Sequence, residues 1–197
     1  MEEKLLNKKI ELLVIGGSAG SFDVLLQVIP KIKSDINFPI IIILHRKSNT
    51  PTSIAKIFSS KTNLPVIECE EKEILQPGTI YFSPPDYHLL VENDHSVSLD
   101  SSEKVNYSRP SIDVTFKNLA DLYHENLAAI LLSGANSDGA KGLFYIKRNN
   151  GITIVQDPAV AEIKFMPQQA INLFEVDHIF NIEEIINYIN NINTTLN

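Results

Sequence analysis

Several uninterrupted runs of apolar residues cross this chain, and each is followed by a glycine-rich or polar segment. The runs at 12–15, 39–44 and 128–132 contain no polar side chain. Such runs are typical of strands buried on both faces, as in a parallel sheet that helices cover on both sides. The carboxyl ends of parallel strands share one edge, where ligands bind. Residues that follow the runs are therefore the first candidates for a functional site.

Helical patterns alternate with these strands along most of the chain. Val24, Leu25, Val28 and Ile29, for example, recur at the spacing of one helix face. The predicted helices cover 22–32, 52–60, 111–123, 139–148, 167–174 and 182–192; the predicted strands cover 11–16, 38–44, 65–69, 79–83, 88–92, 96–100, 128–133, 152–156 and 177–180. Alternation of this kind predicts an α/β fold of three layers, α/β/α, with a mostly parallel, doubly wound sheet.

The middle of the chain departs from the alternation. Gly78, the pair Pro84-Pro85 and the pair Asn93-Asp94 separate short strands with no helix between them. This predicts a short antiparallel excursion. No repeat or long linker divides the sequence, so we expect one domain over residues 1–197.

Composition excludes several classes of protein. The formal net charge of -7 disfavours a nucleic-acid partner, which needs a basic face. No apolar run approaches the ~20 residues of a membrane span, and the acidic N-terminus is unlike a signal peptide. The single cysteine, Cys69, lies among glutamates that disfavour its thiolate, and it allows no internal disulfide. A cytoplasmic protein without membrane insertion is the expectation.

Ser18 follows the first predicted strand in the sequence Gly16-Gly17-Ser18-Ala19-Gly20. A strand, a glycine-rich turn and a helix place its hydroxyl at the carboxyl edge, beside backbone N–H groups that stabilise an oxyanion. The string also fits the Gly-x-Ser-x-Gly pattern of nucleophile elbows, in which small neighbours permit a strained turn. A phosphate-cradling or merely tight turn is the alternative.

A cofactor or metal site fits the sequence less well. Dinucleotide-binding folds need Gly-x-Gly-x-x-Gly and an acidic residue near the end of the second strand, but here that strand ends at His45. No lysine follows the glycine-rich loop as in a Walker motif, and no histidines form a His-x-x-x-His pair. The sequence therefore predicts neither a cofactor nor a metal site.

His45 and Asp138 follow two other predicted strands and can complete a nucleophilic triad with Ser18. A neutral imidazole can take the serine's proton, and a carboxylate can hold the imidazole in the required tautomer. The alternative for Asp138 is a structural role, because Asp-Gly before a helix is a common turn and N-cap. Asp157, which ends another strand, competes for the acid's role; two further candidates, Asp113 and Asp121, lie within a predicted helix. The chain order Ser, His, Asp is not that of ordinary lipases and esterases.

Taken together, these segments resemble the catalytic domain of the chemotaxis protein-glutamate methylesterases, the CheB family. The resemblance covers about residues 12–181 and rests on blocks in the family's order: 14–20, the strand ending at His45, 75–81, 88–90, 109–114, 131–142, 156–159 and 166–171. It implies a serine hydrolase that removes methyl groups from glutamyl methyl esters of chemoreceptors, with deamidation of receptor glutamines as a second activity. Methylated cytoplasmic helices of chemoreceptors are the implied partners.

The resemblance also assigns roles to residues. It places Ser18, His45 and Asp138 in the triad, which favours Asp138 over Asp157. The backbone amides of Ala135 and Ala19 are the implied oxyanion donors.

Several positions depart from the family's pattern. Ala19 stands where threonine is common, and Gly134-Ala135-Asn136 replaces the usual Gly-Met-Gly before the aspartate. We expect Asn136 to adopt the left-handed conformation that glycine supplies. Arg46 and Lys47 are expected either to meet acidic receptor helices or to form a solvated strand end. Arg109 is expected to be either a buried structural arginine or a substrate contact.

Many family members carry an N-terminal receiver domain that blocks the active site until it is phosphorylated. Here about ten residues precede the first predicted strand. The sequence is therefore expected to be either a naturally single-domain form, which a separate protein would regulate, or a piece cut from a longer protein. A catalytically weak interaction module of a signalling complex and a phosphate-binding module are the alternative functions.

Overall fold

A seven-stranded parallel sheet forms the centre of the protein in the computed structural model, which describes residues 9–46 and 53–192. Its strand order is β3-β4-β2-β1-β7-β8-β9, and every neighbouring pair is parallel. The strands are β1 (Leu12–Gly17), β2 (Ile40–Leu44), β3 (Val66–Glu68), β4 (Ile80–Phe82), β7 (Leu127–Leu131), β8 (Ile152–Gln156) and β9 (His178–Phe180).

The central strands β1, β2 and β7 carry no polar side chain because both faces of the sheet are covered. Every residue of β1, β2, β7 and β8 is buried. Alternate side chains enter different cores: Leu13 and Ile15 of β1 pack in one, whereas Leu12 and Val14 pack in the other. This two-residue period is that of a strand between two layers.

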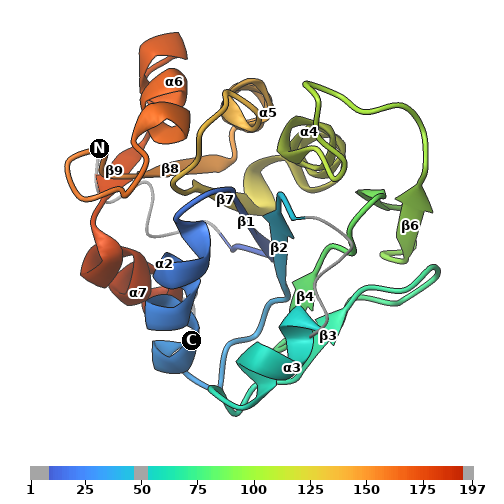
Figure 1. Ribbon diagram of the computed structural model, residues 1–197. Helices are drawn as coiled ribbons and strands as arrows, with labels where there is room; N and C mark the ends of the chain where they lie inside the picture. Colours follow the sequence, from blue (N-terminus) through green and yellow to red (C-terminus); the bar gives the residue numbers. More distant parts are fainter. Residues whose placement is uncertain (1–8, 47–52, 193–197) are drawn as a thin grey trace.

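Helices cover the two faces (Figure 1). The core on one face includes residues of α2 (Ser21–Val28), the short 3-10 turn Ile29–Lys31, α3 (Ile54–Ser59) and α7 (Ile182–Asn191). The core on the other face includes residues of α4 (Ile112–Tyr123), α5 (Ala140–Arg148) and α6 (Phe165–Leu173). A second 3-10 turn, His124–Asn126, leads into β7. The predicted three-layer α/β/α fold is confirmed.

The antiparallel excursion is present but smaller than the sequence indicated. It consists of β5 (His88–Val91) and β6 (Val97–Asp100), which form a two-stranded antiparallel sheet. The short strands β3 and β4, which the sequence grouped with this region, instead pair in parallel within the main sheet. The segment that connects β3 to β4 contains no helix, so the alternation of strands and helices did not predict that they pair in parallel.

The sheet order places a topological switch point beside β1. From β1 the chain adds β2 beside it, then β3 at the edge and β4 between β3 and β2, and it then returns to the other side of β1 with β7. Crevices outside the carboxyl ends of strands at such a point are the usual ligand sites of doubly wound sheets. Among the described residues, no helix is long and apolar enough to cross a membrane.

Candidate active site

Ser18 follows β1 directly, and its turn is fastened to the end of β7. The Ser18 backbone N–H donates to the Ser133 carbonyl at 2.9 Å. The Ser21 hydroxyl donates to the same carbonyl at 2.6 Å, and the Ser133 hydroxyl donates to the Ala19 carbonyl at 2.9 Å. These bonds hold the partly exposed Ser18 at the carboxyl edge of the sheet.

Gly20 is required by the geometry of this turn. Its φ is 81°, and an added Cβ would lie 2.7 Å from Ser133 Oγ and 2.9 Å from Glu162 Cβ. Ser18 itself is not among the residues with positive φ in the described chain. The left-handed residue of the expected strained turn is therefore Gly20 rather than the serine.

His45 follows β2, the parallel neighbour of β1. Gly17 pairs with Leu44, and the His45 N–H donates to the Gly17 carbonyl at 3.2 Å. Ser18 and His45 are thus the next residues along two neighbouring strands. In the described chain no hydrogen bond joins the Ser18 hydroxyl to the imidazole, whose Nε2 lies 2.8 Å from Asp138 Oδ2.

Asp138 is fully buried and accepts hydrogen bonds from four groups. Besides His45, these are the Ser111 hydroxyl at 2.8 Å, the Ile112 N–H at 2.7 Å and the Asp113 N–H at 3.1 Å. Burial opposes ionisation, but the hydrogen bonds from His45, Ser111 and Ile112 outweigh it, so the pKa of Asp138 is lowered. The carboxylate is ionised at neutral pH.

The other aspartates that the sequence left open have different partners. Asp157 Oδ1 accepts from the Ala159 N–H at 2.8 Å. Asp113 Oδ1 accepts from the Gly139 and Gly142 N–H groups at 2.8 and 2.7 Å. Of these acids, Asp138 is the one beside His45. Its catalytic role stays a prediction.

The hydrogen bond between His45 and Asp138 determines which imidazole nitrogen is unprotonated. Because an ionised Asp138 only accepts, His45 Nε2 carries the proton in the neutral ring and Nδ1 holds a lone pair. The side-chain amide of Asn136 lies 3.5 Å from Nδ1. Its oxygen accepts from the Asp138 N–H at 3.1 Å, which orients the nitrogen toward His45. The prediction that Asn136 is left-handed is wrong, because its φ is not positive; the side-chain bond shapes the turn instead.

Two backbone N–H groups lie in turns that are joined by a hydrogen bond: Ala19 follows Ser18, and Ala135 is two residues beyond Ser133, whose carbonyl accepts from the Ser18 N–H. Ala135 and Ala19 are both exposed, and within the described residues neither N–H group has a hydrogen-bond acceptor. Free N–H groups beside a nucleophile are suited to stabilising an oxyanion. Their assignment as oxyanion donors stays a prediction.

Neither candidate arginine is a free surface cation. Arg46 Nη2 lies 2.5 Å from Glu68 Oε1 and donates to the Ser83 carbonyl at 3.2 Å, with 14% of its side chain exposed. Arg109 Nη1 donates to the Ser101 and Ser102 carbonyls, both at 2.6 Å. Arg46 is thus not a solvated strand end, and Lys47 lies outside the described residues.

Sequence reasoning did not identify Ser111 and His88 as support for the acid. Ser111 is the N-cap of α4, and its hydroxyl binds Asp138. Its N–H donates to Nδ1 of the buried His88 at 3.1 Å, while Nε2 of His88 lies 3.0 Å from the Glu103 carbonyl. The segment Pro110-Ser111-Ile112-Asp113 carries the usual signal of a helix start, which could have marked Ser111.

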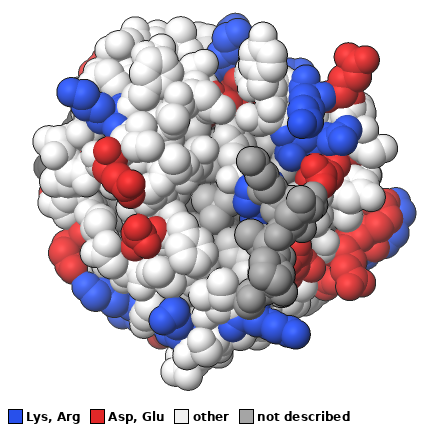
Figure 2. Space-filling model, viewed as in Figure 1, with Lys and Arg blue, Asp and Glu red and all other residues white. Residues whose placement is uncertain are grey.

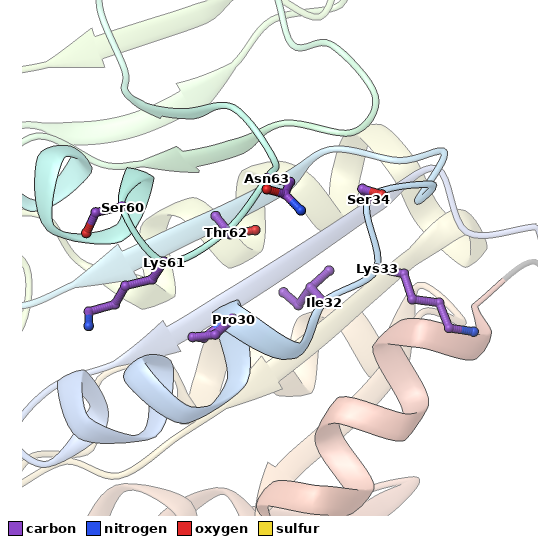
Figure 3. Close-up of a pocket in the computed structure, with 8 residues that line it drawn as sticks. All are labelled: Pro30, Ile32, Lys33, Ser34, Ser60, Lys61, Thr62 and Asn63. Atoms are coloured by element: carbon purple, nitrogen blue, oxygen red, sulfur yellow. The ribbon is translucent and has the colours of Figure 1, made fainter.

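Other features of the described part of the chain contribute no second reactive centre. Burial, followed by the charge of Glu73, raises the pKa of Cys69 to about 12. In residues 9–46 and 53–192, no three acidic, histidine or cysteine side chains group to hold a metal ion. A cavity of about 440 Å³ lies near the opposite edge of the sheet, beside Pro30 and Thr62. The side chains of Lys33 and Lys61 at this cavity point away from one another (Figure 3), so they form no anion site.

Charges are unevenly distributed on the face drawn in Figure 2. The left half of this face is mostly white with a few separate acidic and basic groups, whereas Lys and Arg side chains gather toward α4 and the loop that precedes it.

The chain matches a family model described as CheB methylesterase over residues 13–189. The protein belongs to the CheB methylesterase family. This confirms the resemblance that the sequence blocks indicated.

Relatives and a solved structure agree with the CheB assignment. A relative from Leptospira interrogans is 41% identical over 175 residues, which are 89% of this chain and 91% of the relative. The protein-glutamate methylesterase/protein-glutamine glutaminase of Thermotoga maritima is 31% identical over 172 residues, 86% of this chain and 50% of that protein. The crystal structure of the Thermotoga maritima CheB methylesterase catalytic domain has a TM-score of 0.87 and 30% identity, covering 92% of this chain and 97% of that chain.

Proposed function

We propose that this CheB methylesterase domain hydrolyses glutamyl methyl esters with Ser18 as the nucleophile, His45 as the general base and Asp138 as the acid that orients it. The observation that carries the proposal is the His45–Asp138 hydrogen bond of 2.8 Å at the strand edge beside Ser18. A buried carboxylate that accepts from an imidazole next to a serine is the arrangement that activates a hydroxyl.

In the first half of the reaction, Ser18 attacks the ester carbonyl. His45 Nδ1 takes the hydroxyl proton, which requires the serine to approach Nδ1 in the substrate complex; such hydrogen bonds often tighten only on binding. The Ala135 and Ala19 N–H groups donate hydrogen bonds to the negatively charged oxygen of the tetrahedral intermediate and stabilise it. Collapse of the intermediate breaks the C–O bond, and the proton on Nδ1 leaves with methanol.

In the second half, water cleaves the acyl-enzyme. His45 Nδ1 takes a proton from the water, and the same donors stabilise the second oxyanion. The glutamate is released and Ser18 recovers its proton. Throughout, ionised Asp138 stabilises the transient imidazolium and holds Nε2 protonated.

The names of the relatives indicate the substrate class. The Thermotoga maritima protein is named for action on protein glutamate methyl esters and protein glutamines. We infer that this chain acts on methylated cytoplasmic helices of chemoreceptors, that it can deamidate glutamines at such positions, and that it works in the cytoplasm. A primary amide reacts through the same acyl-enzyme, with ammonia as the leaving group.

A serine-directed fluorophosphonate probe tests the nucleophile directly. The wild-type protein should be labelled at Ser18, and a methyl-labelled chemoreceptor fragment should release methanol. Ser18→Ala should abolish labelling and lower methanol release by several orders of magnitude. Ser34→Ala, an exposed serine at the distant cavity, is the matched control and should change neither.

The non-catalytic alternative gives a different result. An interaction module would bind the chemoreceptor fragment without labelling or methanol release in the wild type. If Ser18→Ala kept more than about a tenth of wild-type activity, far outside the ~10²–10⁴-fold effect of even a general base, Ser18 would not be the nucleophile.

A further inference from the structure

A tight turn between β6 and α4 contains two left-handed residues in succession. Val105 and Ser108 exchange backbone hydrogen bonds of 3.1 and 2.9 Å. Between them, Asn106 has a φ of 50° and Tyr107 a φ of 63°. This is the pattern of a type I′ turn, whose second central position favours glycine. Tyr107 thus holds a conformation that is strained for a bulky side chain.

No contact of the Tyr107 side chain within the described protein offsets this strain. Tyr107 is 99% exposed, and in the described residues its ring stacks on no aromatic side chain and lies under no cation. Folding would be served better by glycine, which adopts positive φ without steric cost. Strain that folding does not explain points to a role outside the fold.

The turn is attached to the candidate active site. The Ser108 hydroxyl lies 3.5 Å from Asn136 Nδ2, the same nitrogen that lies 3.5 Å from His45 Nδ1. Asn106 Nδ2 donates to Asp113 Oδ2 at 3.1 Å, beside the bonds between α4 and Asp138. In Figure 1 the green loop that contains this turn projects from the body of the protein before α4. The phenol ring therefore stands at the rim of the site rather than in it.

We propose that Tyr107 is a specificity-determining residue that packs against the protein helix presenting the methyl ester to Ser18. This inference rests on the proposed function. A helix with its side chains is about 10–12 Å across, so one that places a glutamyl ester between Ser18 and His45 extends over the rim. Tyrosine is well suited to such a contact, because its ring offers a large surface with few rotatable bonds. A small ester held between these side chains would not reach the ring.

The test separates recognition from chemistry. Three variants are compared with wild type: Tyr107→Gly, which removes the ring and relieves the turn; Tyr107→Phe, which keeps the ring; and Tyr145→Ala, which removes another exposed ring from α5. The readouts are kcat/KM on a methylated chemoreceptor cytoplasmic fragment, the rate of fluorophosphonate labelling, and the melting temperature. Binding of the same fragment is also measured in the Ser18→Ala background, where no turnover is needed.

Tyr107→Gly should lower kcat/KM about tenfold or more and weaken binding of the fragment by a similar factor, which is the usual effect of a central interface residue. Its labelling rate should equal that of wild type and its melting temperature should be unchanged or higher. Tyr107→Phe should behave as wild type in every assay, and Tyr145→Ala should keep the wild-type binding, kcat/KM and labelling rate. Unchanged binding and kcat/KM in Tyr107→Gly would overturn the proposal, and so would a fall in its melting temperature, because the ring would then serve the fold. Absence of labelling in wild type would instead overturn the proposed function, whatever the binding data show.

Discussion

Asp138 accepts backbone hydrogen bonds from the start of α4, and Asp113 accepts backbone hydrogen bonds from the start of α5. Asp138 precedes α5 and binds the N–H groups of Ile112 and Asp113 at the start of α4. Asp113, in the first turn of α4, binds the N–H groups of Gly139 and Gly142 at the start of α5. Two carboxylates thus satisfy unpaired donors at two helix starts. The same exchange aims the second oxygen of Asp138 at His45.

Asp138→Asn should damage both turnover and stability. Turnover should fall by up to ~10⁴, because an amide favours the wrong imidazole tautomer. The amide also offers one acceptor where the carboxylate has two, so a buried donor loses its partner at a cost of about 1–3 kcal/mol. Methanol release and urea denaturation measure the two effects.

Asp157→Asn is the control for this variant, because Asp157 binds only the nearby Ala159 N–H among its described side-chain contacts. Its turnover should match that of wild type. Loss of turnover in Asp157→Asn with full activity in Asp138→Asn would transfer the acid's role to Asp157.

The stability of Asp113→Asn relative to wild type should increase as the pH rises. Burial, together with the charge of Asp138, raises the pKa of Asp113 above 3.8, although the Gly142 N–H opposes the shift. A raised pKa means that the folded state binds the proton more tightly than the unfolded state. The stabilisation from Asp113 is therefore complete below pH 3.8 and is lost as the pH rises through the folded pKa. Asparagine does not titrate, so the variant escapes this loss.

Urea denaturation of both proteins from pH 3 upward measures the difference. The free energy of unfolding of Asp113→Asn relative to wild type should increase through this window and then level off. Turnover should stay within about threefold, which corresponds to less than ~1 kcal/mol. A relative stability that falls with rising pH would show that the ionised carboxylate is the favourable form.

The sequence predicted the parts of the site that follow from strand order. Ser18 and His45 come directly after buried runs, and a parallel sheet brings such residues to one edge. Asp138 is harder to predict, because Asp157 directly follows β8, whereas Asp138 stands several residues beyond the end of β7. What distinguishes them is the start of α4, which supplies the donors that hold Asp138 in place.

Other parts depended on contacts that no pattern encodes. The antiparallel excursion was predicted too broadly, because short strands without an intervening helix can still pair in parallel, as β3 and β4 do. Asn136 was expected to imitate glycine, yet its side-chain bond to the Asp138 N–H gives the turn another shape. Arg46 could not be paired with Glu68 from the sequence, because 22 positions separate them.

Arg109→Lys should destabilise the protein without affecting substrate binding. Arg109 Nη1 donates to two successive carbonyls, those of Ser101 and Ser102. Lysine keeps the positive charge but cannot reproduce the geometry of the guanidinium group. Loss of one or two hydrogen bonds costs about 0.5–1.5 kcal/mol each. Thermal unfolding should show a lower melting temperature, and KM for the chemoreceptor fragment should be unchanged. A raised KM at constant melting temperature would make Arg109 a substrate contact.

Asn136→Asp should shift the pH dependence of activity. The new carboxylate can still accept from the Asp138 N–H, so the turn is kept, but an anionic oxygen replaces the amide nitrogen that faces His45 Nδ1. A negative charge there stabilises the imidazolium, which cannot act as a base. The acid limb of the pH–rate profile for methanol release should therefore move to higher pH than in wild type. Asn136→Ala removes the amide without adding charge and should leave the limb in place. An identical shift in both variants would show that the lost amide, rather than the added charge, controls the base.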